Sequence, residues 1–336
     1  MFKRVSIRIL TVALALGFAA CAPSSSTSAA ATSKVTRLSV ATGGTGGVYY
    51  VYGGALARLI SESVPGVEAT AEVTSASIDN LKFLRDGKAD LAFTLADTLK
   101  DASEGHGAFA GRPIDLRALA VLYTNVTHVV AKRESGISKL SDLKGKVVSM
   151  GSAGSGTETI ADRTLSAAGL DPARDIRREN LSAQASADAL KDGKIDAFFW
   201  SGGLPTAAVL DLAISAPIRL LDTESVLPKL QAQYGDGLYR PFSIPPSTYT
   251  SVETETRTFG VSNVLVVPAT FDDERAYLIV RMMFEKQAAL AAAHAEARNL
   301  TLKSAVTGSP IAFSAGALKY FAEKGAISPV PPQKPY

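Results

Sequence analysis

The sequence predicts an α/β protein that is built from two similar domains. Strand-like apolar runs alternate with stretches of helical periodicity. Two glycine-rich loops each separate a predicted strand from a predicted helix, and the order of elements around them occurs twice. The chain has 336 residues, 46% of them hydrophobic, which is enough for about two domains with substantial cores.

The first half of the pattern predicts strand, glycine loop, helix, strand, helix and strand. These elements are expected at residues 38–40, 43–47, 52–60, 67–73, 78–84 and 91–95. Ser77 is a suitable N-cap for the second helix, and Gly87 suits its C-terminus. This alternation is typical of a parallel sheet that is covered by helices.

The second half repeats the pattern around a second glycine-rich loop. The expected strand, loop, helix, helix and strand lie at residues 144–150, 151–157, 158–165, 187–191 and 197–200. An Asp-Gly-Lys sequence follows a predicted helix in both halves. Asp86 lies 42 positions after Gly44, and Asp192 lies 41 positions after Gly151. Asp-Gly-Lys is a common helix end, so a chance likeness is the alternative, but the matched spacing favours two similar domains.

Both glycine loops are expected at the carboxyl ends of strands, where open α/β sheets bind ligands. If the two domains face each other, the loops converge on one cleft. The first N–H groups of a helix favour an anion, and hydroxyl and glycine N–H groups can hold a carboxylate. Tyr49 offers one such hydroxyl. The predicted ligand-binding residues are Thr42, Gly44, Thr45, Gly46, Gly47, Tyr50, Ser77, Asp97, Ser152, Gly154, Ser155, Gly156, Thr157 and Trp200.

These residues also have simpler interpretations. Taken alone, each Ser or Thr is better explained as a helix cap or a turn residue. The two loops together favour ligand contact, because so many glycines are poor for stability without a purpose. Trp200, the only tryptophan, either packs in the core or forms a wall of the cleft.

Other chemistry lacks the residues that it needs. The loop at 151–157 resembles a phosphate-binding P-loop, but Thr157 stands where that loop needs a lysine. The three histidines have no metal-ligand spacing, and no Gly-x-Ser-x-Gly elbow occurs. The net charge is +3 and no basic run contains interleaved aromatics, so nucleic acid is not an expected partner. We therefore expect a binding protein without a cofactor or metal, not an enzyme.

The N-terminus has the pattern of an export signal. Basic residues precede an uncharged apolar run at 9–20, which is too short to span a bilayer as a helix. The run ends at Cys21, the only cysteine, as in bacterial lipoprotein signals, where this cysteine carries the lipid. Ordinary cleavage that leaves a free thiol is the alternative. We expect a signal peptide at 1–21, a flexible tether at 22–34 and a periplasmic or extracytoplasmic protein with a lipid anchor at Cys21.

Residues 42–50, 151–157 and 196–206 carry three motifs in a fixed order. Together they resemble the TAXI family, the extracytoplasmic solute receptors of tripartite ATP-independent periplasmic (TRAP) transporters. The resemblance implies a type II periplasmic-binding-protein fold, with two α/β domains joined by hinge strands around a ligand cleft. It also implies a glutamate-like amino acid or a dicarboxylate as ligand, and a TRAP membrane permease as partner. The sequence departs from the family pattern at Phe313-Ser314-Ala315, where a histidine is common.

This resemblance leads to a domain division. Domain I is expected at 35–123 and 268–336, domain II at 124–267, and the hinge strands at 118–132 and 260–268. Within the first hinge segment, the strand-like runs are 116–123 and 128–132, with a break at 124–127.

The expected function is capture of a small organic anion outside the cytoplasm and its delivery to a TRAP-type ion-driven permease. One alternative is the ligand-binding component of a membrane sensor. The other is an exported transferase that uses the glycine loops for a phosphate-bearing substrate. That enzyme would need a general base in the cleft, and Asp97 is the only candidate.

Overall fold

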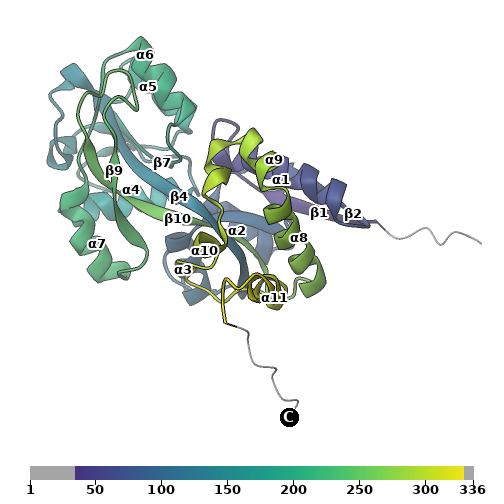
Figure 1. Cartoon of the computed structure of the whole chain (residues 1–336). Helices are drawn as coiled ribbons and strands as arrows, with labels where there is room; N and C mark the ends of the chain where they lie inside the picture. Colours follow the sequence, from purple (N-terminus) through teal and green to yellow (C-terminus); the bar gives the residue numbers. More distant parts are fainter. Residues whose placement is uncertain (1–34, 329–336) are drawn as a thin grey trace, which may run out of the picture. The chain divides into compact units, whose positions relative to one another are not determined.

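A ten-stranded sheet runs through residues 35–328, the part of the chain that this computed structural model describes (Figure 1). The strand order is β2-β1-β3-β10-β4-β7-β5-β6, and in addition β8 pairs with β4 and β9 pairs with β10. The strands are β1 Thr36–Ala41, β2 Val67–Glu72, β3 Leu91–Leu95, β4 Leu116–Lys132, β5 Val147–Ser149, β6 Arg177–Glu179, β7 Ala197–Gly202, β8 Ile218–Leu220, β9 Tyr239–Ile244 and β10 Thr256–Pro268. All described residues belong to one compact unit of the chain, Val35–Tyr336.

Eleven α-helices surround this sheet in the described residues. They are α1 Val48–Ser63, α2 Ser77–Arg85, α3 Ala96–Glu104, α4 Gly156–Ala167, α5 Ala183–Lys191, α6 Ala207–Ser215, α7 Leu227–Tyr234, α8 Asp273–Glu285, α9 Gln287–Ala293, α10 Leu302–Ala305 and α11 Ala315–Glu323. A short 3₁₀-helix, η5 Ala295–Asn299, follows α9.

The sheet has a parallel part at each end. At one end β2, β1 and β3 are parallel, and with α1–α3 and α8–α11 they form what we call the first lobe. At the other end β6, β5 and β7 are parallel, and with α4–α7, β8 and β9 they form the second lobe. The α/β class and the two-domain periplasmic-binding-protein type of fold expected from the sequence are thus confirmed.

The two long strands β4 and β10 belong to both lobes. β10 pairs with β3 in the first lobe and with β9 in the second, while β4 pairs with β10 and β7, all antiparallel. They contain the expected hinge segments, although they begin earlier, at Leu116 and Thr256. The break expected at 124–127 is wrong, because β10 and β7 both supply backbone partners there and β4 continues unbroken. The domain boundaries within these strands stay a prediction.

The buried apolar residues show how the lobes are held together. One cluster includes residues of both lobes, such as Leu99 of α3 and Ile160 of α4. Two further clusters are confined to one lobe each, around Leu56 and Met283 in the first and around Leu212 in the second. Because the shared cluster contains side chains of both α3 and α4, it holds the two lobes together.

The Asp-Gly-Lys sequences end helices in both lobes, as expected. Asp86 is the C-cap of α2 and Asp192 is the C-cap of α5. The glycine that follows each has a left-handed backbone, with φ of 66° at Gly87 and 73° at Gly193. Glycine adopts this conformation without the penalty that a Cβ brings, which explains the repeated sequence.

The predictions made for the N-terminus lie outside the described residues. These are the signal peptide at 1–21, the lipid attachment at Cys21 and the tether at 22–34. Between residues 35 and 328, no helix is long and apolar enough to cross a membrane.

Candidate ligand-binding site

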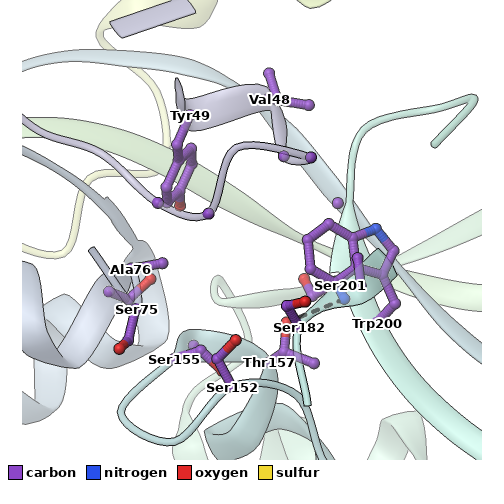
Figure 2. Close-up of a pocket in the computed structure, with 18 of the residues that line it drawn as sticks. Val48, Tyr49, Ser75, Ala76, Ser152, Ser155, Thr157, Ser182, Trp200 and Ser201 are labelled. Atoms are coloured by element: carbon purple, nitrogen blue, oxygen red, sulfur yellow. Dashed lines mark hydrogen bonds between the residues drawn. The ribbon is translucent and has the colours of Figure 1, made fainter. Parts of the chain in front are cut away.

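A cavity of about 240 Å³ is lined by both lobes. It is smaller than the roughly 300–1,000 Å³ of sites for drug-sized ligands, so its volume suits a small molecule. Figure 2 shows the labelled side chains around an open centre. Val48 and Tyr49 lie on one side, and Ser152, Ser155 and Thr157 lie on the opposite side.

Four helices begin at this cavity. The first residues of α1, α2, α4 and α5 all line it, and they are Val48, Ser77, Gly156 and Ala183. Each helix follows a parallel strand of its lobe, namely β1, β2, β5 or β6, so the carboxyl ends of both parallel sheets point to one place. The first N–H groups of a helix have no acceptor within the helix and carry partial positive charge. The cavity is therefore suited to an anion.

The helix caps leave many of these N–H groups free for a ligand. The Ser155 hydroxyl accepts from the N–H of Glu158 at 3.2 Å, and the Ser182 hydroxyl accepts from Ala185 at 3.3 Å. Each cap hydroxyl therefore accepts from the third N–H of its helix and leaves the first two N–H groups without a side-chain cap. Gly47, the N-cap of α1, has no side chain to donate to or accept from that helix. The N–H groups of α1, α4 and α5 therefore remain the main donors.

The side chains that line the cavity carry no formal charge in the described part of the chain. They are those of Thr45, Val48, Tyr49, Val73, Ser75, Ala76, Ser77, Leu95, Tyr123, Asn125, Ser152, Ser155, Thr157, Ser182, Ala183, Gln184, Trp200 and Ser201, together with glycines of the loops. An anion here would be held by backbone dipoles and neutral hydroxyl groups, with no ion pair to a lysine or arginine.

Ten of the predicted site residues meet at this cavity. They are Gly44, Thr45, Gly46, Gly47, Ser77, Ser152, Ser155, Gly156, Thr157 and Trp200. The two glycine loops do converge. The contact of these residues with a ligand stays a prediction.

Four predicted site residues do not line the cavity, and for two of them the cause is burial. Thr42 is fully buried, and its hydroxyl donates to the backbone oxygen of Glu72 at 2.6 Å. Asp97 is also fully buried, and it accepts from the Tyr239 hydroxyl at 2.8 Å and lies 3.6 Å from Arg163 Nη1. Both belong to the internal structure of the fold.

The other two are oriented away from the cavity. Tyr50 lies on α1 and is 36% exposed, because one helical position turns its side chain away from that of Tyr49. Gly154 uses its backbone oxygen to accept from the N–H groups of Ile78 and Asp79, at 3.1 and 3.2 Å. Ser77 lines the cavity but is not an N-cap. Its hydroxyl accepts from Leu95 N at 3.2 Å.

Several residues at the cavity were missed by the sequence analysis. They are Gly43, Val48, Val73, Ser75, Ala76, Leu95, Tyr123, Asn125, Ser182, Ala183, Gln184, Ser201 and Gly202. Ser182 could have been found from its position before α5, since a serine before an apolar periodic run marks a helix start. Asn125 fell in the segment that was expected to interrupt β4. Tyr49 also lines the cavity; the sequence offers its hydroxyl as a donor, but Tyr49 is not among the predicted ligand-binding residues.

A buried polar network crosses the floor of the cavity from one lobe to the other. The Tyr49 hydroxyl donates to Asn263 Oδ1, and Asn263 Nδ2 donates to Asn125 Oδ1 at 2.9 Å. Asn125 Nδ2 in turn donates to the backbone oxygen of Ser201 at 3.1 Å. Burial raises the pKa of Tyr49 well above its ordinary value, which keeps its hydroxyl protonated as a donor. The network connects α1, β10, β4 and β7.

Among the described residues, the Ser201 hydroxyl oxygen is the one buried side-chain polar atom of the lining that has no hydrogen-bond partner. The side chain is 5% exposed, and its Oγ is buried without a hydrogen-bond partner. Its backbone N–H donates to the Thr157 hydroxyl at 3.3 Å, so β7 and the second glycine loop are in contact here (Figure 2). A buried hydroxyl without a partner is costly, and a polar ligand would relieve that cost.

Trp200 forms a wall of the cavity, as one of the two interpretations of the sequence expected. Its indole N–H donates to the Thr206 hydroxyl at 2.9 Å. A Cβ at Gly202 would lie 2.3 Å from the indole nitrogen, so only glycine leaves room for this ring. On the opposite lobe, a Cβ at Gly47 would lie 3.7 Å from the ring edge. The indole therefore reaches across to the first glycine loop.

Close to the second loop, Glu158 is paired with Arg178. Glu158 accepts from the N–H of Gly154 at 2.8 Å and from Arg178 at 2.6 Å, and Arg178 also contacts Asp162. Within residues 35–328, no group of three or more His, Cys, Asp or Glu side chains could hold a metal ion.

Solved structures that are similar to this chain include the following three. A protein of Bordetella bronchiseptica RB50 shares 18% identity over 88% of this chain and 91% of that one, with a TM-score of 0.53. The alkanesulfonate-binding protein SsuA of Xanthomonas axonopodis pv. citri, bound to MOPS, shares 17% identity over 88% and 81%, with a TM-score of 0.47. The aliphatic sulphonate binding protein SsuA of Escherichia coli shares 15% over 87% and 79%, with a TM-score of 0.46. At such identities the likeness concerns the fold alone.

The family of the chain is broader than the sequence motifs suggested. The narrower resemblance to the TAXI receptors stays a prediction. The family model that matches covers residues 40–325, which include both glycine loops and nearly all of both lobes. The chain belongs to the NMT1-like family.

Proposed function

We propose that this protein is an extracytoplasmic solute-binding protein that captures a small organic anion between its two lobes. The observation that carries the proposal is the meeting of helix N-termini from both lobes at a small cavity that contains an unpartnered buried hydroxyl, Ser201 Oγ. A ligand there contacts both lobes at once, so it stabilises the closed arrangement more than an open one.

The lobes also contact each other directly beside the cavity. Gly154 accepts from the first N–H groups of α2, and Leu204 N donates to Glu296 Oε1 at 2.9 Å. Gly154, Leu204 and Glu296 do not line the cavity, so these contacts leave it free for a ligand. The ligand is therefore expected to add to a closure that the protein partly supports by itself.

The proposal includes the partners expected from the sequence. The protein would deliver its ligand to a TRAP-type membrane permease and would be held at the membrane by a lipid on Cys21. A glutamate-like amino acid or a dicarboxylate is one form that the anion could take. The transferase alternative loses support, since Asp97, its only candidate base, is buried away from the cavity.

The test is Ser155→Asp, measured by isothermal titration against a panel of amino acids, monocarboxylates, dicarboxylates and sulfonates. Aspartate is an N-cap as good as serine, so α4 keeps its cap and the melting temperature of the empty protein stays nearly unchanged. The added negative charge repels an anion, so binding is expected to fall by about 100-fold or more.

A matched control is Thr301→Asp, which exchanges the N-cap of α10 outside this cavity. This variant is expected to bind as the unaltered protein does. A folded Ser155→Asp variant with unaltered affinity would exclude the second glycine loop from the site. A folded unaltered protein that binds no member of the panel would contradict the proposed function.

A further inference from the structure

The charges around the cavity restrict which anions it can take. An acid group can be held by the free N–H groups of α1, α4 and α5. The start of α2 contributes less, because Ile78 and Asp79 already donate to Gly154. The donors therefore converge from the first glycine loop on one side and from the two second-lobe helices on the other.

A second acid group would lack a basic side chain to pair with it. Arginines near the site are already engaged by carboxylates: Arg178 contacts Glu158 and Asp162, and Arg163 contacts Asp97 and Asp101. Neither arginine lines the cavity. Burying a second negative charge here would leave it without a counter-charge.

An ammonium group would lack a partner as well. No carboxylate lines the cavity among the described residues. Glu158 lies beside the second loop, and its carboxylate oxygens accept hydrogen bonds from Gly154, Arg178 and Asn180. The N–H donors that favour an acid group repel a positive charge in the same small volume.

The cavity also has an apolar part. Val73 and Leu95 line it together with Trp200, and Figure 2 shows Trp200 beside Ser201 and Ser182. An uncharged hydrocarbon body can lie against this indole while its acid group accepts from Ser201 Oγ and the helix N-termini. This arrangement uses both the apolar wall and the unpartnered hydroxyl.

We infer that the ligand is a small organic monoanion, with one carboxylate or sulfonate group and no ammonium group, whose uncharged body packs against Trp200. The inference rests on the proposed function and selects among the anions that it allows. It disfavours the glutamate-like and dicarboxylate ligands that the sequence resemblance implied.

The test compares pentanoate, pentanesulfonate, glutarate and norvaline. All four compounds have five carbons. Compared with pentanoate, glutarate has a second acid group, norvaline has an added amino group, and pentanesulfonate has a sulfonate in place of the carboxylate on a body that is one methylene longer. Isothermal titration of the purified protein is expected to show binding of pentanoate or pentanesulfonate about 100-fold or more tighter than of glutarate and norvaline, because a buried unpaired charge is costly. Titration of shorter and longer carboxylates, from propanoate to octanoate, identifies the chain length that binds most tightly. Comparison of carboxylates with sulfonates shows which acid group the site prefers.

Tryptophan fluorescence tests whether the ligand binds against Trp200. Trp200 is the only tryptophan in the chain, so a change of its emission on binding reports contact with the indole. Ser201→Ala is expected to weaken binding of the acid by about tenfold, since it removes a charge-assisted hydrogen bond. Thr127→Val is the matched control, because Thr127 Oγ1 is also buried without a partner but lies outside the lining.

The outcomes separate this inference from the proposed function. Binding of glutarate, glutamate or norvaline as tight as that of the best monoacid overturns the inference and leaves the proposed function intact. Tight binding of a monoacid without a change of emission overturns the placement against Trp200. No binding of any of these compounds by a folded protein overturns both.

Discussion

At the scale of single residues, His128 shows how a buried polar group is kept neutral. It is 1% exposed; Nδ1 lies 2.9 Å from the backbone oxygen of Val126, and Nε2 lies 2.9 Å from the Tyr249 hydroxyl. The carbonyl needs a proton on Nδ1, and the Tyr249 hydroxyl, which accepts from Thr206 N at 3.1 Å, can donate to Nε2. One ring proton satisfies every partner, so a second proton would disturb the arrangement.

This arrangement predicts a pH dependence of stability. Burial lowers the pKa of His128 from 6.5 to about 4, so between these values the unfolded chain binds a proton that the folded protein does not. The free energy of unfolding is therefore expected to fall by up to about 3 kcal/mol as the pH drops through this range. Urea unfolding between pH 7 and pH 4 measures it. His128→Gln should reduce the slope, whereas His106→Gln, at an exposed position, should not. Equal slopes in all three proteins would contradict the account.

At the scale of elements, the start of α4 sets the distance between the lobes. A Cβ at Gly156 would lie 2.5 Å from Leu95 Cδ1 and 2.7 Å from Ser77 Oγ, both in the first lobe. A glycine at this position thus permits the closed contact. The sequence shows a glycine at this position, but only the packing shows that it leaves space for Leu95 and Ser77.

Gly156→Ala is therefore expected to hold the lobes apart. Alanine suits a helix better than glycine, so the empty protein should unfold at a similar temperature, while ligand affinity falls by about tenfold or more. Titration with the best ligand, together with small-angle scattering of the liganded protein, measures both effects. The control is Gly54→Ala within α1, where a Cβ meets nothing within 4 Å, and it should raise stability without changing affinity. Unchanged affinity of Gly156→Ala would show that this contact does not govern closure.

At the scale of the whole molecule, a buried ionic cluster outside the cavity joins the two lobes. Arg163 of α4 contacts Asp97 and Asp101 of α3, lies 2.9 Å from the Tyr239 hydroxyl, and stacks on Tyr234 at 3.9 Å. Burial alone would lower the pKa of Arg163, but the two carboxylates raise it, so the guanidinium stays charged. Burial raises the pKa of Asp97, and Arg163 opposes that rise.

Arg163→Met is expected to destabilise the protein at neutral pH by about 3–5 kcal/mol, because it leaves the Asp97 charge buried without a partner. The pKa of Asp97 then rises further, so the loss should shrink as the pH falls and the carboxyl takes a proton in the folded state. Thermal unfolding at pH 7 and pH 5 measures this. The double variant Arg163→Met with Asp97→Asn should recover much of the stability. A loss independent of pH would instead indicate lost packing.

Local sequence patterns were sufficient to predict the class of fold and the two glycine loops. Alternating periodicity reports which face of a segment is buried, and glycine before a helix reports a backbone that a ligand can approach. Ten predicted site residues meet at the cavity for this reason. The repeated Asp-Gly-Lys also had a local cause, the left-handed backbone at Gly87 and Gly193.

Which hydroxyl groups line the cavity, and which polar groups are buried elsewhere, depends on the packing of the two lobes. Thr42, Asp97 and Ser201 each follow or end a buried strand, and their local sequences do not differ in a way that separates them. Asp97 packs into the α3–α4 interface, whereas Ser201 meets the cavity, because the shared core sets how the lobes pair. Side-chain direction relative to a distant lobe is a property of long-range packing, which no local pattern contains.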